Sequence, residues 1–189
     1  MSFLRTAFAS LYLAAAASAL TLSDWNSSGN SCGSVTWNGN ADKPVFYFEG
    51  FDATLSAGQS ANCAVHLQFA SGRPGYRLVL DEVSTWGNLR LDAGGAATFF
   101  TTSFWSESAA DTANDRLESA TRSAFTGDVA IDATSLSLAS GCVGASGAGG
   151  ILNVNFRVVA EDGTVRFGPE KGSKKAAVSQ HLALKWVAC

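Results

Sequence analysis

The chain has 189 residues, of which 13 are Lys or Arg and 16 are Asp or Glu, and its formal net charge is −3. This weakly acidic balance gives no electrostatic basis for binding nucleic acid or an anionic membrane surface. Hydrophobic residues make up 47% of the chain, which is enough for a buried core, and the length is that of a single domain.

The first 19 residues have the layout of a secretory signal peptide. Arg5 is followed by an uncharged run that ends in Ala17-Ser18-Ala19, an A-x-A cleavage pattern. A transmembrane anchor or an amphipathic first helix is the alternative, but the run is short for a span and no basic stop-transfer cluster follows it. We therefore expect residues 1–19 to be removed and the mature protein to be secreted and extracellular, without membrane insertion. The cell wall is one location that fits this prediction.

Residues 20–31 precede the first cysteine and are predicted to form a flexible N-terminal arm. They contain Asn26-Ser27-Ser28, the one N-x-[ST] sequon of the chain. In a secreted protein such a sequon is an acceptor for an N-linked glycan. The sequence therefore predicts glycosylation at Asn26.

Most of the remaining chain alternates apolar and polar residues with a period close to two, which is typical of half-buried strands. Turn formers separate these segments, and Glu161-Asp162-Gly163 favours a hairpin. Only Ser106 to Ser123 resembles a helix, and it fits a long polar loop equally well. Many short strands with frequent turns predict an all-β fold, a single antiparallel β-sandwich domain over residues 32–189 with one short helix or loop excursion. The clearest predicted strands are 45–51, 64–70, 76–83, 128–138, 151–159 and 181–187.

The four cysteines are Cys32, Cys63, Cys142 and Cys189, and none lies in the predicted signal peptide. An even number in an oxidising compartment predicts two disulfides, for which three pairings are possible. We favour Cys32 with Cys63 and Cys142 with Cys189, because each pair then joins neighbours in the sequence. A structural zinc site is the alternative, but the chain has no C-x-x-C motif and only two histidines.

Motifs for catalysis are weak. No G-x-S-x-G elbow occurs, and His66 and His181 alternate with apolar residues, so we expect both on outer sheet faces. No spacing selects a serine or an aspartate as partner of either histidine. Paired carboxylates would suit a glycosidase, but such acids more often keep an exposed face soluble. We therefore predict no catalytic residue. The acidic pairs are Asp81 with Glu82, Glu49 with Asp52, and Asp128 with Asp132.

Two polar loops could hold ions. Asp111, Asn114 and Asp115 offer oxygen ligands for calcium, but their spacing is not that of an EF-hand, so no metal site and no cofactor is predicted. Lys171, Lys174 and Lys175 form a basic turn. We interpret this turn as a solvated connection, with contact to an anionic glycan as the second interpretation.

The aromatic residues give the best indication of a ligand. The chain has five tryptophans, and Trp86 and Trp105 lie near predicted turns or strand ends. An exposed indole beside polar neighbours can stack on the apolar face of a sugar ring while the neighbours bind its hydroxyls. Trp86, Trp105 and Tyr76 are therefore the predicted ligand-binding residues. The alternative is that these rings fill the core of the sandwich.

Several segments resemble one known family. They are SCGSVTWN, ANCAVHLQF followed by PGYRL, WGNLRLDAGGAATFFTTSFW, SGCVG, ILNVNFRV and the terminal LALKWVAC. Together they are similar to DUF4360, a family of small secreted, mainly fungal proteins, and the resemblance runs from about Cys32 to Cys189. The family has no agreed activity or catalytic residues, so the resemblance implies no site.

These observations predict a secreted, disulfide-stabilised β-sandwich without catalytic chemistry that binds a partner outside the cell. The partner is a cell-wall glycan or a host protein, and an effector-like role is implied only by the resemblance. The alternative is a small extracellular hydrolase of the glycosidase or Ser/His type. An aromatic patch on one sheet face would favour binding, and a cleft with a histidine hydrogen-bonded to a serine or carboxylate would favour catalysis.

Overall fold

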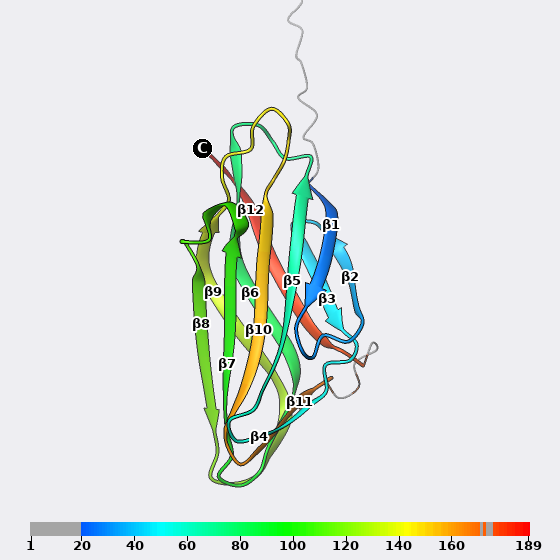
Figure 1. The fold of residues 1–189 in the computed structure, drawn as a ribbon, viewed down its shortest axis with the longest axis vertical. Coiled ribbons are helices and arrows are strands. Elements are labelled where there is room, and N and C mark those ends of the chain that lie inside the picture. Colours follow the sequence, from blue (N-terminus) through cyan, green and yellow to red (C-terminus); the bar gives the residue numbers. More distant parts are fainter. Residues whose placement is uncertain (1–19, 171, 173–175) are drawn as a thin grey trace, which may run out of the picture.

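The computed structural model describes residues 20–170, 172 and 176–189. The predicted signal peptide and the three lysines of the basic turn lie outside the described residues. The described chain is all-β, and its two antiparallel sheets pack against each other as the layers of a sandwich (Figure 1). The predicted fold class is thus confirmed. No helix of the described residues is long and apolar enough to cross a membrane.

The first layer is a five-stranded sheet in the order β1-β5-β10-β7-β8. The bounds are Thr21–Ser28 for β1, Ser60–Ala70 for β5, Ile151–Asp162 for β10, Ala96–Trp105 for β7 and Ala113–Ala120 for β8. A 3-10 turn, Ser106–Ser108, follows β7.

The second layer is a seven-stranded sheet in the order β2-β3-β12-β6-β11-β4, with β9 paired to the other edge of β6. Its long central strand β6 pairs with β12 over its first part and with β11 over its last part. The bounds are Val35–Asn40 for β2, Lys43–Phe48 for β3, Ala53–Ser56 for β4, Tyr76–Leu91 for β6, Phe125–Ala139 for β9, Thr164–Gly168 for β11 and Val178–Ala188 for β12.

The core lies between the sheets and is rich in phenylalanine. The alternating apolar residues of each strand point inward, as their period of two requires. Phe167 of β11 is in ring contact with Phe51, Phe99 and Phe156, at centroid distances of 6.1, 5.4 and 5.4 Å. Such pairs contribute about 0.5–1.5 kcal/mol each beyond the burial of their area. This cluster therefore fixes how the two sheets face each other.

The segment from Ser106 to Ser123 differs from its prediction. It contains only the 3-10 turn and then β8, which pairs with β7 from Ala113 opposite Ser103 to Ala120 opposite Ala96. The weak helical period is overridden because the free edge of β7 offers a row of backbone partners, and such pairing outweighs a small difference in intrinsic propensity.

Residues 20–31 also differ from the expected loose arm. Strand β1 occupies Thr21–Ser28 and pairs with β5 from Thr21 opposite Ala70 to Ser28 opposite Ala64. The sheet therefore begins at Thr21 and not after Cys32. Leu22 and Trp25 of β1 pack against the core, which explains why the segment is held.

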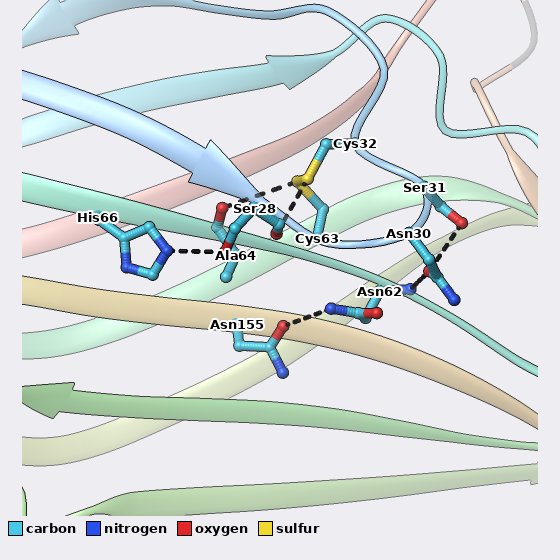
Figure 2. Close-up of a disulfide and its surroundings, with 9 residues drawn as sticks. All are labelled: Ser28, Asn30, Ser31, Cys32, Asn62, Cys63, Ala64, His66 and Asn155. Carbon is cyan, nitrogen blue, oxygen red and sulfur yellow. Dashed lines mark hydrogen bonds between the residues drawn. A yellow bond between two sulfur atoms is a disulfide. The ribbon is translucent and has the colours of Figure 1, made fainter.

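Both disulfides have the predicted pairing. Cys32 bonds Cys63, with Cα atoms 4.8 Å apart, and so ties the segment after β1 to β5 (Figure 2). Cys142 bonds Cys189, with Cα atoms 6.1 Å apart, and the backbone N–H of Cys189 also donates to the carbonyl of Gly75 at 2.9 Å. The last residue is therefore fixed to the loop after β9 and to the turn before β6.

Candidate ligand-binding face

The outer face of the seven-stranded sheet is built around the central strand β6. Because side chains alternate along a strand, Val83, Leu89 and Leu91 point into the core and every second residue in this part of β6 points outward. We call this outer surface the Trp86 face. Its row along β6 consists of Glu82, Ser84, Trp86, Asn88 and Arg90.

Trp86 is the exposed aromatic of this row, with 41% of its surface accessible. Small residues lie directly opposite it, Ser179 on β12 and Ala130 on β9, so neither neighbouring strand covers the indole. The ring of His181 lies 6.2 Å from the indole, centroid to centroid, and inclined to it by 57°. Trp86 is therefore a ring platform on the surface with one aromatic neighbour.

A hollow of about 190 Å³ lies on the β12 side of Trp86. We call it the His181 hollow. Within it, the Ser84 hydroxyl donates to Glu82 Oε1 at 3.1 Å, and His181 Nε2 lies 3.1 Å from Oγ of Ser179, which is outside the lining. Burial lowers the pKa of His181, and the charge of Glu170 opposes this in part, so the imidazole is neutral at neutral pH. The lining residues are Lys43, Val45, Glu82, Ser84, His181, Leu182 and Ala183.

A second hollow, of about 230 Å³, lies at the other end of the row. We call it the Arg90 hollow. Asp52 accepts two hydrogen bonds from the Arg166 guanidinium, at 3.1 Å from Nε and 2.8 Å from Nη2, and this contact raises the pKa of Arg166. The Asn88 amide donates to Asp128 Oδ1 at 2.8 Å. The lining residues are Asp52, Asn88, Arg90, Arg166, Gly168 and Pro169.

The outer face of the five-stranded sheet carries a hydrogen-bonded chain that we call the His66 chain. Ser28 Oγ lies 2.8 Å from His66 Nε2, and His66 Nδ1 lies 2.6 Å from Asn153 Oδ1 (Figure 2 shows the Ser28 contact). Asn153 Nδ2 donates to Ser106 Oγ at 2.8 Å and weakly to the carbonyl of Phe104. Since the Asn153 oxygen must accept, Nδ1 of His66 donates to it, and the contact between Nε2 and the Ser28 hydroxyl extends the chain to β1.

The structure does not bring the three predicted ligand-binding residues together. Trp105 is completely buried, with Nε1 donating to the carbonyl of Leu138 at 3.1 Å, so its prediction as a ligand contact is wrong and it belongs to the core. Tyr76 lies ten residues from Trp86 on β6, roughly 33 Å away along the strand. Its ring is half-buried and the Arg73 guanidinium stands 4.2 Å above its centroid. Only Trp86 therefore remains a surface platform.

Other predicted residues fall into ordinary contacts. Asn26 lies on β1 opposite His66 and is exposed. Asp81 accepts from Lys185 Nζ at 2.6 Å, and Glu49 accepts from the Thr36 hydroxyl at 3.0 Å. Within residues 20–170, 172 and 176–189, no three His, Cys, Asp or Glu side chains are grouped as metal ligands would be.

Sequence reasoning missed Asn88, Arg90 and Arg166 as part of a site. The alternation of WGNLRL did carry the signal for the first two, because Asn88 and Arg90 follow Trp86 in phase. Arg166 comes from β11 and meets this row only through the pairing of β11 with β6.

The solved structures to which the chain is similar include the following three, each at 10 or 11% sequence identity. The structure of TmCBM61 in complex with β-1,4-galactotriose gives a TM-score of 0.29 over 89% of this chain and 90% of that chain. A structure of carbohydrate-binding modules from the β-sandwich superfamily gives 0.26 over 88% and 58%. The enzymatically active domain of bacteriophage CBA120 tailspike protein 4 gives 0.23 over 86% and 20%.

No curated protein matches the chain in sequence. The model of one family, "Domain of unknown function (DUF4360)", matches residues 18–189. The chain belongs to this family.

Proposed function

We propose that this DUF4360 protein is a secreted, non-catalytic β-sandwich that binds a polysaccharide outside the cell through its Trp86 face. One observation carries the proposal: an exposed indole stands between two hollows that include polar groups, on the outer face of a sheet. Sugars present such a mixed surface, since their rings have an apolar face and a rim of hydroxyls.

The row along β6 suits an extended ligand. The distance from Glu82 to Arg90 is roughly 26 Å at about 3.3 Å per residue, so several sugar rings fit along it. Trp86 would stack on one ring, and the carboxylate, hydroxyl and amide beside it would bind the hydroxyls of that ring and its neighbours. A polysaccharide of the cell wall is the ligand class that combines length, rings and hydroxyls in this way.

Two further features support an extracellular location. Both disulfides join described segments of the fold, and such bonds persist in oxidising compartments. Asn26 is exposed on the five-stranded layer, so an N-linked glycan there would leave the Trp86 face open. We expect enzymatic removal of N-glycans to shift the mass of the secreted protein, and Asn26→Gln to abolish that shift.

The experiment is co-sedimentation of the secreted protein with insoluble chitin, β-glucan, cellulose and xylan, with released sugar assayed in the same tubes. We expect binding without release, and Trp86→Ala should weaken it roughly tenfold, equivalent to about 1.4 kcal/mol. Phe100→Ala is the matched control, because Phe100 is a half-exposed ring on the opposite outer face. Sugar release would contradict the proposal, and an absence of any binding would redirect the search to a host protein.

A second candidate function, a small extracellular hydrolase, is favoured by the His66 chain. An imidazole that contacts an amide oxygen through one ring nitrogen and a serine hydroxyl through the other is the arrangement that can activate a nucleophile. Hydrolysis of p-nitrophenyl acetate by the protein tests it, with Ser28→Ala expected to abolish any activity. Because Ser28 also completes the sequon, Asn26→Gln is the control that removes the glycan and keeps the hydroxyl. Equal rates for Ser28→Ala and the unchanged protein would exclude this role.

A further inference from the structure

The Arg90 hollow contains two arginines that face each other. In the pairing of β11 with β6, Arg166 lies directly opposite Arg90, and both side chains point away from the core. Directly opposed side chains on one face of an antiparallel pair have Cβ atoms about 4.5–5.5 Å apart, and like charges there are destabilising. Negative charge placed between the two groups lowers this cost.

The protein itself supplies part of that negative charge. Asp52 forms a fork with Arg166 through two hydrogen bonds, which neutralises this guanidinium and fixes its plane. Gly168 makes room for the fork, because a Cβ at position 168 would stand 2.8 Å from Asp52 Oδ1. The Asp52 side of the hollow is thus built around Arg166.

Arg90 is left over. Its side chain is exposed, and no residue of the described chain forms an ion pair with it. Thr126, which lies opposite Arg90 on β9, is uncharged. Asp128, also on β9, lies opposite Asn88 and accepts from its amide. The hollow therefore holds one exposed guanidinium whose charge the described residues leave unmatched, and a guanidinium has five N–H donors to offer a ligand.

We infer that the Arg90 hollow binds an anionic group of the ligand, so that the preferred polysaccharide is an acidic one. This inference rests on the proposed function, because the anionic group is carried by the same chain that stacks on Trp86. A guanidinium binds a carboxylate or a sulfate ester with two parallel hydrogen bonds, so a uronic acid and a sulfated sugar share the required chemistry. Arg90 is four residues from Trp86, about 13 Å along β6, so the charged sugar would bind at about this distance from the sugar that stacks on Trp86.

The experiment compares soluble chains that differ only in charge. The probes are polygalacturonate and its fully methyl-esterified form, and dextran sulfate and dextran, with affinity measured by calorimetry on the secreted protein. We expect one anionic chain to bind roughly tenfold or more tightly than its neutral counterpart, in line with a charge-assisted fork. Which anionic chain binds identifies a carboxylate or a sulfate as the group.

Variants separate this inference from the proposed function. Arg90→Gln should remove the preference for the charged chain while leaving the affinity for the neutral chain unchanged. Trp86→Ala should weaken both chains alike. Arg157→Gln is the matched control, because Arg157 is an exposed arginine on the other sheet, 4.7 Å from the Phe100 ring.

Three outcomes overturn the inference, and they have different meanings. Equal binding of charged and neutral chains, both weakened by Trp86→Ala, refutes the anionic group and leaves the polysaccharide function in place. A charge preference that Arg157→Gln lowers as much as Arg90→Gln shows general attraction and no site. Absence of binding to every soluble and insoluble polysaccharide removes both proposals together.

Discussion

The two outer faces of the sandwich are both polar, but they use their polar groups differently. On the five-stranded sheet the side chains bond to one another: the His66 chain is continuous, and the Thr102 hydroxyl donates to Asn114 at 2.9 Å. On the seven-stranded sheet some side chains are also paired, as in the fork between Asp52 and Arg166, but the Trp86 indole and the Arg90 guanidinium of one row remain open to solvent. Polar groups that satisfy one another hold strands together, whereas open ones are available to a ligand. This difference, more than polarity itself, is the reason for proposing the Trp86 face as the ligand-binding face.

The largest expected effect separates two tryptophans. Trp105→Ala should lower the free energy of unfolding by about 3–5 kcal/mol, because it removes a fully buried ring from the core. Trp86→Ala should lower it by about 1 kcal/mol or less, since its ring is exposed. Urea denaturation of both variants measures the difference. Equal destabilisation would mean that Trp86 is a packing residue, and the contrast between the faces would fail.

The next effect concerns the disulfide of the five-stranded layer. Replacing Cys32 and Cys63 together by alanine should lower stability by about 2–4 kcal/mol, because the unfolded chain gains freedom. Polysaccharide affinity below the melting range should change little, since the bridge ties β5 and not β6. A large loss of affinity in a variant that is still folded would connect the two layers functionally.

A smaller effect compares two asparagines. Asn153 is 8% exposed, and Asn153→Ala should lower stability by about 1–3 kcal/mol, because it leaves His66 without its partner. Asn88→Ala should change stability by about 0.5 kcal/mol or less but weaken polysaccharide binding, because its amide is on the Trp86 face. The reverse pattern, with Asn88 structural and Asn153 needed for binding, would exchange the roles of the two faces.

The smallest effect is a pH dependence at His181. Burial lowers its pKa in the folded protein below the ordinary value near 6.5, so the unfolded chain takes up the proton more readily. The stability contributed by the neutral imidazole is therefore complete above pH 6.5 and is lost as the pH falls below it. Thermal unfolding at pH 7.5 and 5.5 should show a larger decrease for the unchanged protein than for His181→Gln. All other titrating groups are common to both proteins, so equal decreases would contradict the assignment.

The sequence predicted the architecture better than the edges of the sheets. Alternation in 151–159 and 181–187 was sufficient for β10 and β12, because central strands must bury one face. Edge strands are more exposed, so their sequences need less regular alternation of apolar and polar residues. For this reason β1 was expected to be a loose arm, and β8 was interpreted as a helix or loop. Their pairing with β5 and β7 is a tertiary effect that local pattern does not contain.

For the candidate site, the sequence could identify residues but not their surroundings. Trp86 and Trp105 both lie near predicted turns or strand ends, and only the packing of the two sheets makes one a surface residue and the other a core residue. Arg90 and Arg166 pair although they are 76 positions apart in the sequence, and no local motif predicts this pairing.

The most direct test of the central claim is an NMR titration of the ¹⁵N-labelled protein with soluble fragments of the polysaccharide that sediments it. The Trp86 indole N–H and the amides of Ser84, Asn88, Ser179 and His181 should shift, while those of His66, Asn153 and Asn155 stay in place. Shifts concentrated on the five-stranded sheet instead would contradict the account and place the ligand on the His66 chain.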